Sequence, residues 1–102
     1  MVEKKYRIIV TNRAKWSIKE IHSYIKCFQK SRQNAVRVKR AIIDRIESLS
    51  IHPNRFSIFK ELYGEFGNYR SVSVWDFVIL YEIDELNELL IVDDVFHGAQ
   101  GK

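Results

Sequence analysis

The sequence predicts an α+β fold in the order β-α-α-β-β-β, in which a helical hairpin packs on a mostly antiparallel four-stranded sheet. Two early stretches repeat apolar residues at helical spacing, and three later stretches are rich in β-branched and aromatic residues. The only proline, Pro53, separates the two kinds of pattern. A chain of 102 residues, 46% of them hydrophobic, is long enough for one core and too short for two. Residues 1–102 are therefore expected to form a single domain.

The first half of the chain predicts a strand followed by two helices. Apolar side chains alternate from Tyr6 to Val10, which indicates a strand, and Thr11 or Asn12 can cap the helix that follows. One face of this first helix carries apolar residues at steps of three and four: Ala14, Ile18, Ile21, Ile25 and Phe28. A second stripe of the same spacing predicts a helix that ends near Ser50: Ala35, Val38, Ile42, Ile46 and Leu49. The polar link, residues 29–34, is short enough to make the two helices antiparallel.

The second half of the chain predicts a turn and then three strands. Pro53 biases the residue before it, His52, away from helical angles, so the chain turns there. The strands are expected at Tyr69–Val74, Phe77–Ile83 and Leu89–Phe96, with a tight turn at Trp75 and Asp76. Three residues of these strands should join the helical stripes in the core: Leu80, Leu90 and Val92.

Charge is divided unevenly along the chain. Residues 1–50 hold 13 Lys or Arg against 4 Asp or Glu, whereas residues 51–102 hold 4 against 9. The halves therefore carry +9 and −5, which together give the net charge of +4. This division predicts an acidic partner, protein or nucleic acid, that approaches the basic first half. The alternative is a solvated surface with no partner.

The sequence also indicates where the protein acts. No apolar run approaches the length needed to cross a bilayer, so no membrane association is expected. The first residues lead directly into a strand pattern and lack the apolar run of a signal peptide. The lone Cys27 has no partner for an internal disulfide, which fits a reducing compartment. A cytoplasmic location is the expectation.

Motifs for metals and cofactors are missing from the sequence. The glycines do not form a phosphate-binding or dinucleotide-binding pattern, so no cofactor is expected. Asp93 and Asp94 are neighbours on a predicted strand and should point to opposite faces, which prevents them from acting as a catalytic pair. A metal site is not expected either, because three residues that could bind one are far apart: His22, His52 and His97.

The order of motifs along the whole chain resembles the RelE/ParE toxin superfamily. The segments IHPNRF, GNYRSVSVWDFVILYEID and LLIVDDVFHGAQ follow one another as they do in that superfamily. Residues that match the family pattern occur at each element: Ala14, Tyr24, His52, Pro53, Tyr69, Arg70, Ile79, Leu80, Tyr81, His97 and Gly98. The resemblance implies the toxin of a type II toxin–antitoxin (plasmid stabilisation) system, paired with an antitoxin that is acidic toward its carboxyl end.

RelE-like members of the superfamily cleave messenger RNA on the ribosome, and the resemblance implies candidate residues for such cleavage. The reaction needs a base or orienting group, a cation for the phosphate and an acid for the leaving oxygen. Arg70 and His97 match two such positions, and Lys60 or Arg55 can supply a further cation. However, Val78 stands where a second arginine often precedes the Ile-Leu-Tyr strand, and no arginine follows His97. The chain therefore lacks some of the cationic side chains that a nuclease of this superfamily uses.

ParE-like members instead inhibit DNA gyrase by binding it, and the ending Val95-Phe96-His97-Gly98-Ala99-Gln100 is more similar to theirs. The low positive charge after Ser50 agrees with this branch, because a surface that cuts RNA is normally lined by cations. A gyrase inhibitor without catalytic residues is therefore the first hypothesis, and a ribosome-dependent endoribonuclease is the second. A decayed or non-toxic binding domain is the third.

Several surface residues are candidates for partner binding. At 100° per residue, Trp16 lies opposite the first apolar stripe, and Val36 and Ile43 share one edge of the second helix, outside its stripe. An amphipathic segment of the antitoxin could dock on this edge, or the edge could pack against residues 51–62. Basic residues occur on the outer surfaces of both helices and form either a binding surface or a solubilising one: Lys15, Lys19, Lys26, Arg37 and Arg40.

Overall fold

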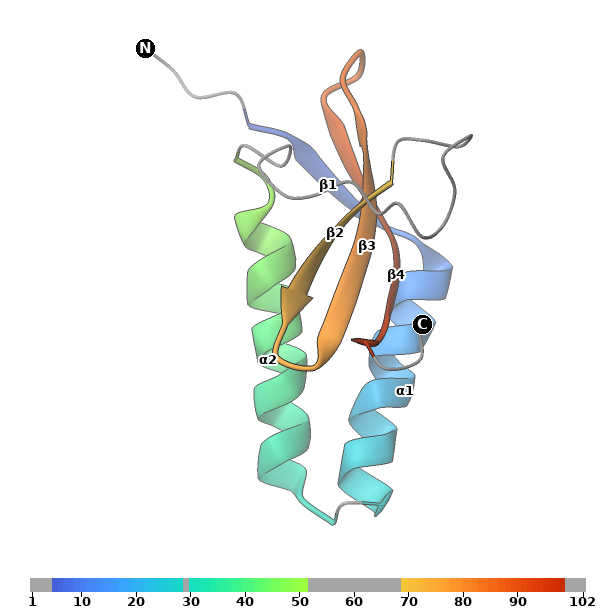
Figure 1. Cartoon of the computed structure of the whole chain (residues 1–102), viewed down its shortest axis with the longest axis vertical. Coiled ribbons are helices and arrows are strands. Elements are labelled where there is room, and N and C mark those ends of the chain that lie inside the picture. Colours follow the sequence, from blue (N-terminus) through green and yellow to red (C-terminus); the bar gives the residue numbers. More distant parts are fainter. Residues whose placement is uncertain (1–4, 29, 52–68, 99–102) are drawn as a thin grey trace.

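The computed structural model describes residues 5–28, 30–51 and 69–98. The predicted order of elements is confirmed: β1 (Arg7–Val10), α1 (Asn12–Phe28), α2 (Arg32–Ser48), β2 (Tyr69–Val74), β3 (Phe77–Asp84) and β4 (Leu89–His97). The two helices lie side by side on one face of the sheet (Figure 1). None of the described helices is long and apolar enough to cross a membrane.

The four strands form one mixed sheet in the order β1-β4-β3-β2. The meander of β2, β3 and β4 is antiparallel, and β1 joins it as a parallel neighbour of β4. The predicted turn at Trp75 and Asp76 connects β2 to β3. Because β1 ends at Val92 of β4, no strand of the described residues pairs with the rest of β4 on that side, and α1 begins beside it. This arrangement confirms the mostly antiparallel sheet and places the amino end of α1 against the last residues of β4.

Both helices begin at a capping side chain. Thr11 Oγ1 accepts a hydrogen bond from the Ala14 amide at 3.1 Å, and Ser31 Oγ accepts one from the Asn34 amide at 3.1 Å. Such caps satisfy one of the free backbone amides in the first turn of a helix. The α2 helix thus begins at Arg32, three residues before the first apolar residue of its stripe, Ala35. The sequence pattern placed this start too late, because polar residues in a first turn do not change the apolar spacing.

The core lies between the two helical stripes and the covered face of the sheet. The stripe residues Ala14, Ile18, Ile42 and Ile46 are buried there, as the helical spacing predicted. The strands contribute the following residues: Val72, Val74, Ile79, Tyr81, Leu90, Val92 and Val95. Leu80 is buried, as predicted, but it does not belong to the cluster that packs against the helices. Alternation along β3 directs its neighbours, Ile79 and Tyr81, toward the helices instead.

A β-bulge interrupts the pairing of β3 with β4. Leu80 pairs with Asp94 and Tyr81 pairs with Val92, which leaves Asp93 without a partner across the ladder. A bulge of this kind adds a residue to one strand and changes the direction of the side chains beyond it. Buried residues of β4 accordingly change from a spacing of two, Leu90 and Val92, to a spacing of three at Val95.

Candidate functional site

The structure places the two described nuclease candidates at different ends of the sheet. Arg70 is half-buried on β2, opposite Tyr81 of β3, whereas His97 is exposed at the end of β4, opposite Phe77. The His97 and Phe77 rings meet edge to face with centroids 5.4 Å apart. Since Tyr81 and Phe77 are four positions apart on β3, the backbones of Arg70 and His97 are separated by about 13 Å along the sheet. The other two candidates, Arg55 and Lys60, lie outside the described residues.

A cluster of acidic and phenolic side chains occupies the middle of the sheet. Tyr69 of β2 lies directly opposite Glu82 of β3, on the face turned away from the helices, because the neighbouring Tyr81 points toward them. Burial raises the pKa of Asp93 to about 7, and a hydrogen bond with Glu82 and the charges of Glu82 and Asp94 add to this effect. The charges of Glu82 and Asp93, together with burial, raise the pKa of Tyr69.

The Asp93 carboxyl is only partly satisfied. Its Oδ2 is buried and has no hydrogen-bond partner in the part of the chain that the structure describes. A hydrogen bond between the carboxyls of Asp93 and Glu82 requires a proton on one of them, because two carboxylates only accept. With the pKa of Asp93 at about 7, this acidic part of the sheet still carries negative charge at neutral pH, which repels an approaching phosphate.

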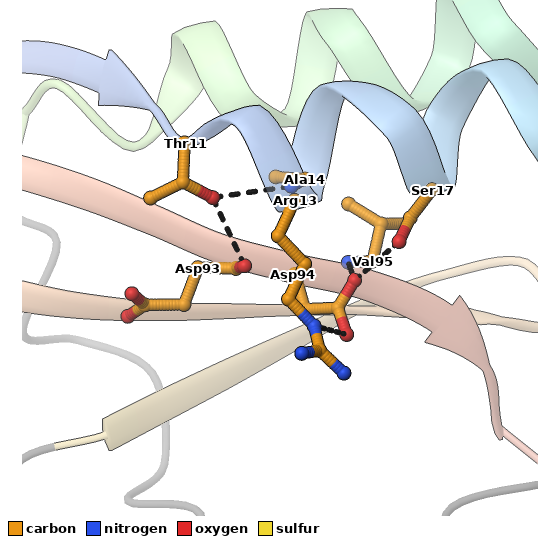
Figure 2. Close-up of polar contacts among 7 residues, drawn as sticks. All are labelled: Thr11, Arg13, Ala14, Ser17, Asp93, Asp94 and Val95. Atoms are coloured by element: carbon orange, nitrogen blue, oxygen red, sulfur yellow. Dashed lines mark hydrogen bonds and ion pairs between the residues drawn. The ribbon is translucent and has the colours of Figure 1, made fainter.

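The side chain of Asp94 links α1 to β4 through hydrogen bonds and an ion pair (Figure 2). Its Oδ1 accepts hydrogen bonds from Ser17 Oγ at 2.5 Å and from the Val95 amide at 2.8 Å. Its Oδ2 lies 3.3 Å from Nε of Arg13, whose side chain is 80% exposed. Thr11 adds a second tie, since its hydroxyl donates to the Asp93 carbonyl oxygen at 3.1 Å while it caps the helix. These bonds give Asp94 a structural role in positioning α1.

The carboxylates of Asp93 and Asp94 point away from each other, as expected (Figure 2). The bulge contributes to their directions, so simple alternation along a strand is an incomplete explanation. Glu82 was not identified from the sequence as the partner of Asp93, because strand register is not visible in a single sequence. A signal was present, since Glu82 is the only charged residue within the apolar run Phe77–Ile83.

The candidate partner-binding residues lie on the outer surface of the helical hairpin. Trp16 is 62% exposed on α1, and Val36 is 60% exposed on α2. Ile43, two helical turns after Val36, is half-buried and does not belong to the core cluster or to the side chains that pack on it. The predicted basic residues of both helices are all exposed: Lys15, Lys19, Lys26, Arg37 and Arg40.

Four further exposed apolar side chains of the described residues were not identified from the sequence, and one of them is Ile9 on β1. Tyr24 lies on α1, Trp75 in the β2–β3 turn and Leu86 in the β3–β4 turn, where it is 91% exposed. The turns that contain Trp75 and Leu86 could be predicted from the sequence. Their exposure could have been predicted as well, because a turn residue lies outside the alternating pattern that buries its neighbours. Among the described residues, no group of three or more metal-ligating side chains comes together.

A family model described as "ParE toxin of type II toxin-antitoxin system, parDE" matches residues 8–101. The chain belongs to this ParE toxin family. The match includes both helices and all strands of the sheet except the first residue of β1. No curated protein sequence matches the chain.

Solved structures similar to this ParE-family chain support the fold. The toxin–antitoxin complex RelBE2 from Mycobacterium tuberculosis contains a chain with a TM-score of 0.69 and 18% identity, which covers 91% of this chain and 98% of that one. The chromosomal ParDE toxin–antitoxin system from P. aeruginosa contains one with a TM-score of 0.72 and 12% identity, which covers 92% and 97%. At these identities the similarity concerns the arrangement of helices and strands, and both RelE-like and ParE-like names occur among the similar folds.

Proposed function

We propose that this ParE-family chain inhibits DNA gyrase by binding it and that a cognate antitoxin neutralises it. The proposal rests on the negative charge of the meander formed by β2, β3 and β4. Residues 69–98 contain one Lys or Arg, Arg70, against seven Asp or Glu. A nuclease must hold a phosphodiester and stabilise the extra negative charge of its transition state, which requires cations around the bond. This surface instead repels a phosphate.

The positions of the candidate residues support the same proposal. Arg70 and His97 belong to opposite ends of the described sheet, and the carboxyl groups of Glu82 and Asp93 lie on β3 and β4. A ribosome-dependent endoribonuclease remains the alternative, since Arg70 and His97 are both present. For that alternative, Arg55 and Lys60 would have to supply the missing cations.

The antitoxin is the second part of the proposal. Both similar solved structures are toxin–antitoxin systems, and the helical half of this chain has a charge of +9. An antitoxin segment with acidic residues would be attracted to this half over long distances and would order itself on it.

Two assays with the purified chain test the proposed target. We expect inhibition of supercoiling by purified gyrase, and no cleavage of messenger RNA on translating ribosomes. Ribosome-dependent cleavage without an effect on gyrase would replace the proposal with the nuclease alternative. Growth that is unaffected by induced expression would contradict both activities and favour a non-toxic binding domain.

A further inference from the structure

The turn between β2 and β3 exposes a tryptophan on a strained backbone. Val74 pairs with Phe77, so the turn consists of two residues, Trp75 and Asp76, which we call the β2–β3 tip. The φ of Trp75 is 53°, in the left-handed region, and its side chain is 60% exposed. Two-residue hairpin turns take a positive φ at their first position, where glycine, asparagine and aspartate are the usual residues. A bulky tryptophan strains the backbone there and buries little apolar surface, so the stability of the fold does not explain its presence.

Contacts from both sides hold the β2–β3 tip in place. The Gly98 amide donates a hydrogen bond to the Asp76 carbonyl oxygen at 2.7 Å, which ties the turn to the residue after β4. The rings of Phe77 and His97 meet edge to face directly behind the turn, and Val74 is buried in the core. Figure 1 shows the turn beside the end of β4, at the end of the sheet opposite to the β3–β4 turn. An aromatic side chain on such a support loses little conformational entropy when it binds, which favours it as the anchor of an interface.

The charge around the β2–β3 tip is negative. Residues 71–98 contain seven Asp or Glu and no Lys or Arg. Asp76 is exposed and forms no ion pair within the part of the chain that the structure describes. An arginine or lysine of a partner can pair with this carboxylate and also stack on the neighbouring indole. Charge complementarity therefore favours a basic protein surface as the partner of the tip.

We infer that the β2–β3 tip anchors the chain on DNA gyrase, in a pocket that is apolar inside and basic at its rim. This inference rests on the proposed function, in which gyrase is the target. An enzyme that acts on DNA carries positively charged surfaces for the phosphates, and such surfaces attract the acidic strands around the tip. The indole of Trp75 fills the pocket, and the carboxylate of Asp76 meets the cation at its rim.

Two other occupants fit the tip less well. Nucleic acid bases stack on exposed indoles, but the carboxylates of the meander repel the phosphates that come with them. A symmetric contact between the tips of two copies would bring one Asp76 against the other. A head-to-tail contact between the tip and the basic helices of another copy would continue into a ring or a filament, which is visible as self-association.

Substitution of Trp75 separates binding from stability. Trp75→Gly removes the indole and relieves the positive φ, so we expect the variant to unfold at the same temperature as the wild type or higher. We expect the concentration for half-inhibition of gyrase supercoiling, and the Kd for gyrase measured by calorimetry, to rise about tenfold or more. Leu86→Ala is the matched control, because Leu86 is 91% exposed at the opposite hairpin turn. This control should change both values by about twofold or less.

Reversal of one charge tests the basic rim of the pocket. Asp76→Lys reverses the charge of the tip and leaves the indole in place, so we expect several-fold weaker binding to gyrase. Glu88→Lys makes the same change in net charge at the opposite hairpin turn and should weaken binding less. The affinity of the wild-type chain should fall with added salt. Circular dichroism of each variant checks that the fold is retained.

Other outcomes would overturn the inference. Equal inhibition of gyrase by the wild type and Trp75→Gly would exclude the tip as the anchor and leave the proposed function intact. A wild-type chain that does not inhibit gyrase would contradict the proposed function and the inference together. Self-association of the wild type that Trp75→Gly abolishes, measured by analytical ultracentrifugation, would assign the tip to a second copy. Binding of single-stranded DNA that the same substitution abolishes would assign it to nucleic acid.

Discussion

At the scale of single residues, the ionisation of Asp93 makes the stability of the fold depend on pH. Burial of this carboxyl and its position beside Glu82 raise its pKa to about 7. The folded chain therefore keeps a proton on Asp93 that the unfolded chain releases near pH 4. Between these two values the folded state binds more protons than the unfolded state, so the free energy of unfolding decreases as the pH rises. Above about pH 7 the carboxyl is ionised in the folded state as well, and the loss of stability is complete.

Asp93→Asn should remove this dependence. The amide cannot ionise, so we expect the variant to gain stability relative to the wild type as the pH rises from 5 to 8. The relative gain is about 1 to 2 kcal/mol after allowance for solvent screening of a partly exposed group. Urea unfolding followed by tryptophan fluorescence at several pH values measures it.

Asp84→Asn provides the matched control for this measurement. Hydrogen bonds from Asn87 lower the pKa of Asp84, so this carboxylate stays ionised throughout the range from pH 5 to 8. Its substitution should shift stability by the same amount at each pH. A difference between Asp93→Asn and the wild type that is equally constant would show that Asp93 does not titrate in this range.

At the scale of elements, the attachment of α1 to β4 depends on one well-placed carboxylate. The side chain of Asp94 is only 20% exposed, and Ser17 donates to it across the junction of helix and strand. Arg13 also contacts Asp94, but from an exposed position where solvent weakens an ion pair. The hydroxyl of Ser17 therefore contributes more to stability than the charge of Arg13.

Two alanine variants test whether Ser17 contributes more to stability than Arg13. Ser17→Ala should lower the free energy of unfolding by about 1 to 2 kcal/mol, because a hydrogen bond to a charged group is lost. Arg13→Ala should lower it by about 0.5 kcal/mol or less. Thermal unfolding by circular dichroism measures both, with Ser23→Ala, an exposed serine of the same helix, as the control. A larger loss for Arg13→Ala than for Ser17→Ala would contradict the proposed role of Asp94.

The elements themselves were largely predictable from the sequence, whereas their ends and irregularities were not. Apolar spacing located both helices, and the runs of β-branched residues located β2 without error. The start of α2 was misplaced because the capping Ser31 leaves no mark on that spacing. The bulge at Asp93 was missed because it depends on how β3 and β4 pair, which is a property of two strands together.

At the scale of the whole molecule, the two charge blocks of the sequence become two layers. Both helices carry a net positive charge, and residues 69–98, which form three of the four strands, carry a net negative charge. The helical spacing predicted the exposure of Trp16 and Val36, because a helix is a local structure. The separation of Arg70 from His97 was not predicted, because that distance follows from the register of three strands.

Substitution of Arg70 and His97 separates the two possible activities of this fold. If the toxin acts by binding gyrase, neither side chain touches a reacting atom, and Arg70→Ala and His97→Phe should change its inhibition of supercoiling by about threefold or less. The phenylalanine keeps a ring against Phe77 but cannot transfer a proton, which makes it a cleaner test than alanine. In a nuclease, loss of a proton-transfer group costs about a hundredfold or more in rate. Undiminished RNA cleavage by His97→Phe would exclude proton transfer by this residue, whereas a hundredfold loss of cleavage with unchanged unfolding temperature would contradict the binding mechanism.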